Sequence, residues 1–166
     1  MTSREKSFRM KKIILLFIIG LSILSCSDSD NNDCCVIVDI GIQIKYVNTA
    51  GQNLFEIDNG YKASDITIYH KINREWSEYY KSNLDAPKGI SVIDGENGKM
   101  LFISPSTTLD ENNYSETKIQ FSESDFDIIK TEIDKSNSGT MVTKVWYNTV
   151  LKWEAYDTDR SFDIVK

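Results

Sequence analysis

The stretch that decides the fold of this chain is Val36-Ile37-Val38-Asp39-Ile40-Gly41-Ile42-Gln43-Ile44-Lys45-Tyr46. Large apolar residues stand at every even position, and the odd positions after Ile37 hold Asp39, Gly41, Gln43 and Lys45. Successive side chains of a β-strand point to opposite faces, so a period of two is typical of a strand. We therefore expect residues 36–46 to form a single strand with the even-numbered side chains on one face.

Shorter runs of alternating or β-branched residues follow, and turn residues separate them. They predict strands over residues 65–70, 75–80, 90–93, 100–103, 117–121, 127–133, 140–147 and 150–154. Asn73-Arg74 is predicted to turn the first pair into a hairpin, and residues 94–98 turn the second. The last three strands are expected to form a meander with turns at 136–139 and 148–149. Residues 123–129 have a second interpretation as a short helical turn, because Ser124 and Asp127 form a weak capping box.

The number and spacing of these runs indicate the fold class. About nine short strands, with turns roughly every 8–14 residues, predict an all-β fold. No segment has the sustained 3.6-residue period of an amphipathic helix. Our first expectation is a single antiparallel β-sandwich over residues 35–166, immunoglobulin-like or transthyretin-like. A small up-and-down β-barrel of the lipocalin kind is the alternative, since about nine strands can close.

Charge is distributed unevenly along the chain. The net charge is −6, from 19 basic and 25 acidic residues. Residues 1–25 hold five of the basic residues and one of the acidic ones, so the remainder has 14 against 24 and a net charge near −10. Nucleic-acid binding needs a concentrated basic face, and anionic lipid headgroups repel an acidic body. We therefore expect no nucleic-acid partner, and attachment to a membrane requires another anchor.

An export signal is predicted at the N-terminus. Lys11 and Lys12 precede an apolar segment at residues 13–24, and Ser25-Cys26 follows it. A helix that spans a membrane needs about 20 apolar residues, so this segment is short. A positive region, a short apolar region and a small residue before the cut are typical of a secretory signal. Met10 begins the compact form of this signal, so we expect translation to start there, with Met1 as the alternative.

Ile23-Leu24-Ser25-Cys26 resembles the lipobox of bacterial lipoproteins. That pattern has an aliphatic residue three positions before the cysteine and a small residue directly before it; Leu24 is bulkier than the usual Ala or Ser. The resemblance covers about the first 26 residues. It implies a signal peptide over 1–25, cleavage before Cys26, a thioether-linked diacylglycerol on Cys26 and a fatty acyl group, such as palmitate, on its amine. Several acyl chains anchor a protein stably to a membrane. An ordinary cleaved signal and an uncut membrane anchor are the alternatives.

A flexible tether is predicted between the lipid and the fold. Residues 26–34 contain Ser27-Asp28-Ser29-Asp30-Asn31-Asn32-Asp33, which is small, polar and acidic. The stretch resembles the acidic export address of surface-exposed lipoproteins of the Bacteroidota. The terminal Val145-Trp146-Tyr147-Asn148 hairpin also resembles small lipoproteins of that phylum, and this likeness brings no known activity. The acidic address implies export to the cell exterior. Ser27 follows the cysteine in place of the Asp associated with inner-membrane retention, which favours the outer membrane; the periplasmic face is the alternative.

Two cysteines remain once Cys26 is assigned to the lipid. Cys34 and Cys35 are adjacent, so a disulfide between them closes a small strained ring, and pairing between chains is a second route in an oxidising compartment. In the third interpretation Cys35 is a small apolar residue at the start of a strand. The chain has one histidine and no second cysteine pair, so we expect no zinc site and no other metal site.

Nothing in the sequence predicts a catalytic set. His70 is the only histidine, so a Ser-His-Asp or Cys-His site would have to use it. It lies in the alternating run with Ile66 and Ile68, which indicates a strand residue at a sheet edge or core margin. The eight glycines form neither a phosphate loop nor a dinucleotide fingerprint, so no cofactor is expected. Among 24 acidic residues some carboxylate pair always lies at a distance suited to a glycosidase, so such a pair indicates little.

Four aromatic side chains cluster in the predicted hairpin: Tyr69, Trp76, Tyr79 and Tyr80. Sugars stack on exposed aromatic rings, so these four are candidate ligand-binding residues. Trp76 and Tyr80 share a strand face, and Tyr79 points the other way. The alternative, which we favour, is that half of the cluster belongs to the core and half covers a sheet face. Trp146 and Trp153 are expected in the core.

Three functions follow from these observations. The first is a non-catalytic binding or structural module on the outer membrane, held by the lipid on Cys26 and partnered by an envelope protein. The second is a binder of glycans or small ligands through the hairpin aromatics. The third is a hydrolase that uses the acidic residues or His70.

Overall fold

The structure is a computed structural model of the chain, and it describes residues 37–136, 139–156 and 158–166. The predicted signal, Cys26, the tether and the Cys34–Cys35 pair lie outside these ranges, so the interpretations that concern them stay predictions. No helix long and apolar enough to cross a membrane occurs in the described ranges.

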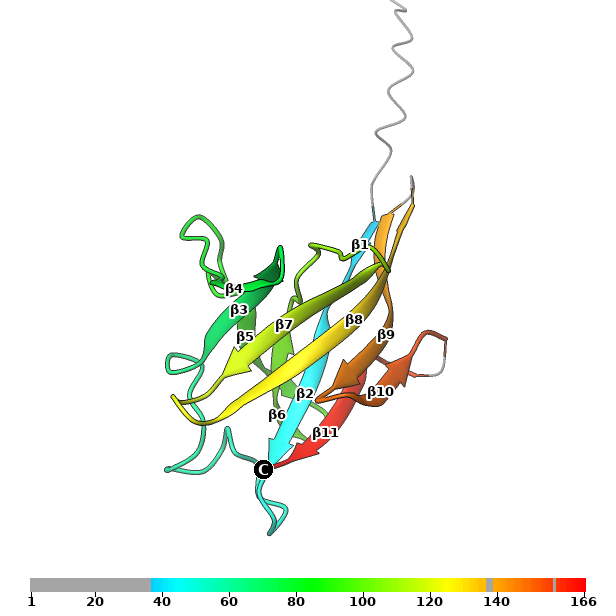
Figure 1. Ribbon diagram of the computed structural model, residues 1–166. Helices are drawn as coiled ribbons and strands as arrows, with labels where there is room; N and C mark the ends of the chain where they lie inside the picture. Colours follow the sequence, from blue (N-terminus) through cyan, green and yellow to red (C-terminus); the bar gives the residue numbers. More distant parts are fainter. Residues whose placement is uncertain (1–36, 137–138, 157) are drawn as a thin grey trace, which may run out of the picture. The chain divides into compact units, whose positions relative to one another are not determined.

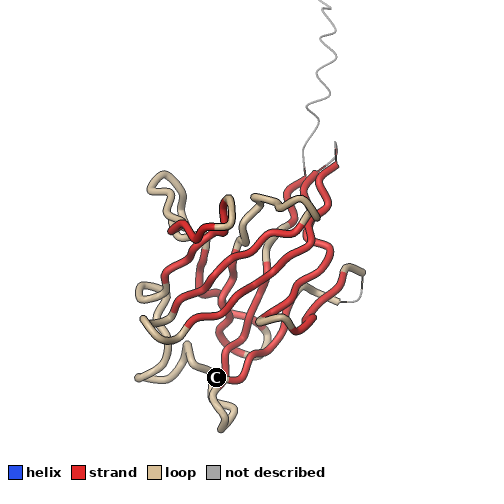
Figure 2. The backbone as a smooth tube through the Cα atoms, in the orientation of Figure 1, coloured by secondary structure: helices blue, strands red, loops and turns tan. Residues whose placement is uncertain are grey.

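The described residues form strands and loops and contain no helix (Figures 1 and 2). The strands are β1 (Ile37–Asp39), β2 (Ile42–Val47), β3 (Thr67–Ile72), β4 (Glu75–Glu78), β5 (Ile90–Gly95), β6 (Gly98–Ile103), β7 (Tyr114–Gln120), β8 (Phe126–Ser136), β9 (Gly139–Tyr147), β10 (Val150–Glu154) and β11 (Ser161–Val165). All eight shorter strands predicted from the sequence are present. The helical interpretation of residues 123–129 is wrong, because β8 begins at Phe126.

Two sheets pack face to face, which confirms the all-β sandwich. The seven-stranded sheet has the order β1-β9-β8-β7-β3-β4, with β10 also paired to β9, and the four-stranded sheet has the order β11-β2-β6-β5. Both described sheets are open, so the alternative of a closed barrel is wrong. Most pairs are antiparallel as expected, but β1 pairs with β9 and β11 with β2 in parallel. Both sheets are therefore mixed.

The run that predicted one central strand divides between the two sheets. β1 belongs to the seven-stranded sheet and β2 to the four-stranded sheet, and the chain crosses between them at Ile40-Gly41. A Cβ on Gly41 would lie 2.5 Å from the Phe102 ring, so any larger residue at the crossing would require that ring to shift. The alternation holds in β2, where every second side chain is buried. It fails in β1, where Ile37 and Val38 are 65% and 64% exposed.

The core lies between the sheets and consists mainly of isoleucine, valine and aromatic side chains. β2 and β6 contribute Ile42, Ile44, Tyr46, Leu101 and Ile103, all fully buried. The facing side chains of the seven-stranded sheet are Ile68, Ile119, Ile129, Val142 and Val145. Each such side chain contributes about 1.5–3 kcal/mol when it leaves water. The alternation of each strand therefore decides which residues point outward from the sandwich.

The two predicted hairpin turns have the backbone that tight hairpins require. Asn73 and Arg74 have φ of 51° and 72°, and Asn148 and Thr149 have φ of 45° and 74°. Two consecutive residues with positive φ define a turn whose twist matches the flanking strands. The first turn brings Trp76 opposite Lys71, and the second brings Leu151 opposite Trp146. Both turns thus determine which side chains meet on the outside of the larger sheet.

A buried polar cluster links the last residue of the chain to the β7–β8 turn. The Lys166 ammonium lies 2.5 Å from Asp127 and 2.6 Å from Asp125. Tyr147 donates a 2.5 Å hydrogen bond to Asp127 and shares another, of 3.1 Å, with Tyr46 of β2. Because Tyr46 and Tyr147 belong to different sheets, the cluster joins the two layers through hydrogen bonds as well as packing.

We predict that Lys166→Met destabilises the fold by about 2–4 kcal/mol, because it leaves two partly or fully buried carboxylates without their cation. Lys99→Met is the matched control, since Lys99 pairs with Asp94 at the exposed end of a hairpin, where solvent screening leaves an ion pair little effect on stability. Urea unfolding at pH 7 measures both. An equal loss in the two variants would contradict the structural role of the Lys166 cluster.

Candidate functional site

The structure separates the four hairpin aromatics predicted as ligand-binding residues. Tyr69 lies on β3 and Trp76 on β4, and both point away from the core, because the neighbouring Ile68 is buried. Tyr79 points the other way and stacks on His70, with ring centroids 4.2 Å apart. Tyr80 follows the end of β4 and is 61% exposed. The sequence therefore identified two residues, Tyr69 and Trp76, that share the outward face of the sheet. Tyr79 and Tyr80 do not belong to that group.

The outward side of the seven-stranded sheet carries more aromatic rings than the hairpin alone. Tyr114 of β7 and Trp146 of β9 also point outward, since Ser115, Val145 and Tyr147 beside them are buried. The expectation that Trp146 lies in the core is therefore wrong. Trp153 is buried as expected, and its indole Nε1 donates to the carbonyl of Thr158.

One row of outward side chains crosses six strands of this sheet. In strand order from β4 to β10 its members are Trp76, Lys71, Glu116, Lys130, Trp146 and Leu151. A tryptophan lies near each end of this row. Four strand spacings separate the two tryptophans, which is about 19 Å.

Three lysines lie over aromatic rings on this side of the sheet. The Lys71 ammonium is 5.6 Å from the centre of the Trp76 ring. The Lys118 ammonium is 3.9 Å from the centre of the Tyr69 ring and 5.8 Å from that of Trp76. The Lys130 ammonium is 3.8 Å from the centre of the Tyr114 ring and 5.8 Å from that of Trp146. We call this surface the aromatic–lysine face and define it by six residues: Tyr69, Trp76, Tyr114, Lys118, Lys130 and Trp146.

The lysines on this side of the sheet fall into two kinds. Lys71 pairs with Glu116 at 2.5 Å, and Lys144 lies between Glu132 and Glu154. Lys118 and Lys130 form no ion pair with any residue that the structure describes. They are diagonal neighbours, because Lys118 pairs with Ile128, two residues before Lys130. Their contacts are with aromatic rings, and their positive charges remain available to a ligand.

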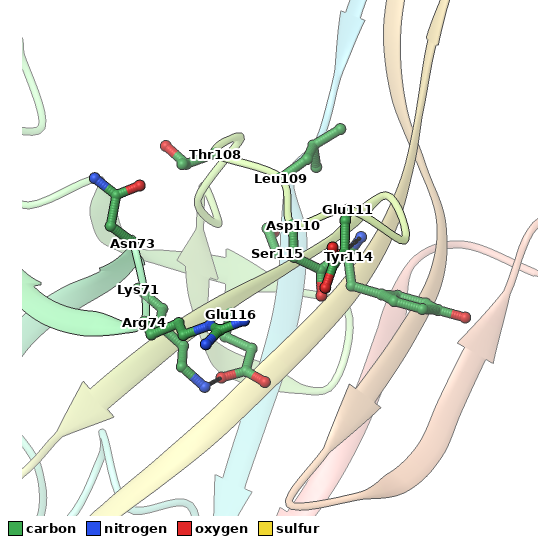
Figure 3. A pocket seen from close by; sticks show the side chains of 10 residues that line it. All are labelled: Lys71, Asn73, Arg74, Thr108, Leu109, Asp110, Glu111, Tyr114, Ser115 and Glu116. Carbon is green, nitrogen blue, oxygen red and sulfur yellow. Dashed lines mark hydrogen bonds and ion pairs between the residues drawn. The ribbon is translucent and has the colours of Figure 1, made fainter.

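A pocket of about 590 Å³ adjoins the face (Figure 3). The β3–β4 turn forms one wall, and the loop before β7 forms the other. Its lining residues are Lys71, Asn73, Arg74, Thr108, Leu109, Asp110, Glu111, Tyr114, Ser115 and Glu116. Most of these are polar or charged, and they suit a ligand rich in hydroxyl groups. Tyr114 lines the pocket and also belongs to the aromatic–lysine face; Figure 3 shows its ring directed away from the other lining side chains.

Two polar residues of the pocket are occupied by the fold itself. The Asp110 carboxylate accepts hydrogen bonds from the backbone N–H groups of Tyr114 and Asn112, and these bonds lower its pKa below the ordinary value. The buried Ser115 hydroxyl is 2.6 Å from the Ser106 carbonyl and 2.7 Å from the Thr131 hydroxyl. Asp110 therefore shapes the loop, and Ser115 holds the strands together.

A second pocket, of about 600 Å³, lies where β1 passes into β2. Arg160 dominates it, with a side chain that is only 9% exposed. It binds the Asp39 carboxylate through both terminal nitrogens, donates to the Gly41 carbonyl at 2.8 Å, and lies 4.5 Å from the centre of the Trp153 ring. Hydrogen bonding from Arg160 lowers the pKa of Asp39. These contacts give Arg160 a structural role: it stabilises the segment where the chain crosses from one sheet to the other.

His70, the residue on which a hydrolase would depend, lines neither pocket. Its Nε2 is buried, and no described residue is within hydrogen-bonding distance of it. Burial, with a smaller contribution from the positive charge of Lys81, lowers the pKa of His70 to about 4. The imidazole is therefore neutral at pH 7 and acts as a flat ring packed on Tyr79.

Comparison with known proteins identifies no relative. No protein-family model matches the chain, and no curated protein or solved structure matches it significantly. Within the described ranges, no three His, Cys, Asp or Glu side chains lie close enough together to hold a metal ion.

The sequence contained partial signals for the residues that it failed to assign to the face. Trp146 lies between Val145 and Tyr147, and Lys118 precedes Ile119. Alternation alone therefore places the side chains of Trp146 and Lys118 on the sheet face opposite to the face of their sequence neighbours. Which of the two faces is buried depends on the partner sheet. The contacts of Lys118 and Lys130 also depend on the register of three strands, which no local pattern specifies.

We predict that His70→Phe reduces the loss of stability in acid. A folded-state pKa near 4, against about 6.5 in the unfolded chain, means that stability is complete above pH 6.5 and falls as the pH drops toward 4. With allowance for partial solvent access, wild type should lose roughly 1–2 kcal/mol more than the variant across this range. Phenylalanine keeps the ring contact with Tyr79. Parallel curves of unfolding free energy against pH would contradict the prediction.

Proposed function

We propose that this chain is a lipid-anchored, non-catalytic binding module of the outer membrane and that it binds glycans through the aromatic–lysine face. The observation that carries the proposal is the group of aromatic rings on the solvent side of one sheet, which includes Trp76 and Trp146 about four strand spacings apart. The lipobox at residues 23–26 and the acidic stretch after it support the anchor and its outward orientation.

Ring geometry favours a glycan over other ligands. The outward side of a sheet is normally polar, so exposed aromatic side chains grouped there indicate a binding surface. The flat aliphatic side of a pyranose packs on an aromatic ring, and a sheet presents several rings in one surface. The polar pocket next to Tyr114 supplies donors and acceptors for the hydroxyl groups. An elongated sugar chain can contact both elements together.

A role in stability alone is the main competitor. Cross-strand contacts between lysines and aromatic rings stabilise a sheet even without a ligand. A role in stability and a role in ligand binding predict different effects of substituting the tryptophans near the ends of the row. Trp76 lies on an edge strand, so its removal should affect ligand binding more than folding.

The environment of His70 supports binding in preference to hydrolysis. The only histidine of the chain packs against Tyr79 and is neutral at pH 7. The buried hydroxyl of Ser115 is engaged by the backbone of Ser106. Neither group is placed to act on a ligand that lies across the aromatic–lysine face.

We predict that Trp76→Ala and Trp146→Ala each weaken glycan binding at least tenfold while the protein stays folded. The assay is a glycan array probed with the full lipidated chain in detergent, followed by titration of the best ligands. Tyr80→Ala is the matched control, because Tyr80 is an exposed aromatic residue outside the face. Silence across broad arrays, together with co-purification of an envelope protein, would instead favour a protein-binding module.

The anchor has its own test. We expect mass spectrometry of the mature protein to find Cys26 as the first residue, with a diacylglycerol on sulfur and an acyl group on nitrogen. Cys26→Ser should abolish both the modification and membrane retention. Protease digestion of intact cells should remove the domain if it faces outward and spare it if it faces the periplasm. An unmodified Cys26 would overturn the anchor.

A further inference from the structure

We infer that the glycan bound by the aromatic–lysine face is a linear acidic polysaccharide of uronic acids, whose carboxylates bind Lys118 and Lys130. This inference rests on the proposed function and specifies its ligand. It begins from the two lysines of the face that lack a carboxylate partner among the described residues.

Lys118 and Lys130 differ from the paired lysines beside them on this sheet face. Outside residues 1–25 the chain has 24 acidic and 14 basic residues, so acidic partners are plentiful. Lys71 and Lys144, on the same side of the sheet, have such partners. Glu116 lies directly opposite Lys130 in the register, yet its ion pair is with Lys71. The surface thus presents two neighbouring ammonium groups that contact aromatic rings and form no ion pair with a described residue.

Register places one lysine with each pair of rings. Lys118 contacts Tyr69 and Trp76, and Lys130 contacts Tyr114 and Trp146. Lys118 also lies 5.9 Å from the centre of the Phe126 ring. Each of the two lysines therefore contacts at least two aromatic rings, and the two lysines lie on the neighbouring strands β7 and β8. A ligand that fits both lysines and their rings presents a sugar ring and a negative charge at regular intervals, as a linear chain of uronic acids does.

The position of each ammonium explains why charge should decide the selectivity. In the free protein the ammonium groups of Lys118 and Lys130 occupy the ring faces on which a sugar would stack. A neutral sugar displaces them and breaks the cation–π contact without replacing it. A uronic acid displaces them and offers a carboxylate as the new partner, which forms a charge-assisted hydrogen bond.

A carboxylate attached directly to the sugar ring suits this displacement better than a longer anionic substituent. The ammoniums start less than 4 Å from the centres of the Tyr69 and Tyr114 rings. A short movement of a lysine side chain brings its ammonium to the edge of a stacked pyranose, where the carboxylate of a uronic acid lies. The repulsion between the acidic body and an acidic polymer acts over longer distances and is screened beyond about 10 Å at 0.1 M salt.

The test titrates the full lipidated chain in detergent, at 0.1 M salt, with polygalacturonate and with its methyl ester, which has the same backbone without the charge. We expect the acid form to bind at least tenfold more tightly. Lys118→Gln and Lys130→Gln should each weaken binding of the acid form about fivefold to tenfold. Neither should weaken binding of the methyl ester, which no longer has to displace a cation from an aromatic ring. Lys45→Gln is the control, because Lys45 points outward from the four-stranded sheet and lies off the face.

The possible outcomes distinguish a failure of the acidic-ligand inference from a failure of the proposed glycan-binding function. Equal binding of both polymers would overturn the acidic ligand and leave glycan binding intact. Tight binding of dextran sulfate with no binding of polygalacturonate would overturn the uronic acid and assign a sulfated glycan. Binding of neither these polymers nor any member of a broad glycan array would overturn the proposed function itself.

Discussion

The crossing at Ile40-Gly41 is the feature on which the division of the chain between the two sheets depends. It lets one continuous run of sequence supply a strand to each sheet. Arg160 holds this crossing, because its guanidinium binds Asp39 on one side, the Gly41 carbonyl at the centre and the Val142 carbonyl of the facing strand. The two parallel strand pairs of the fold, β1 with β9 and β11 with β2, both use this run.

The outward face of the larger sheet follows from this arrangement. Once β2 and β6 cover one side of the seven-stranded sheet, alternation leaves the other side to solvent. Tyr69, Tyr114 and Trp146 point there because Ile68, Ser115 and Val145 point to the core. The same packing that buries the isoleucines therefore creates the surface that we propose as the ligand platform.

Lysine placement distinguishes structural from functional charge in this acidic protein. Lys166 joins Asp125 and Asp127 at the closed end of the sandwich, where its charge is needed to compensate buried carboxylates. Burial alone would lower the pKa of Lys166, but hydrogen bonds to the two aspartates hold it above the ordinary value. Lys118 and Lys130 lie on aromatic rings at the surface, where no buried carboxylate requires them. Of these three lysines, only Lys118 and Lys130 are placed to contact a ligand.

The sequence by itself determined the strand content, the hairpin turns at 73–74 and 148–149, and the sandwich class, because these depend on local alternation and on turn residues. It failed at β11, although Phe162 and Ile164 alternate there, since the run is short and its parallel partner is distant in sequence. It also failed to divide the first strand, because apolar residues continue to alternate through Gly41, and the division depends on the pairing of β1 with β9 and of β2 with β6. Tertiary structure alone decided that Trp146 faces outward and that Lys118 and Lys130 lie on aromatic rings. Those contacts require the register of strands that are far apart in the chain, and the period of two is the same for either face.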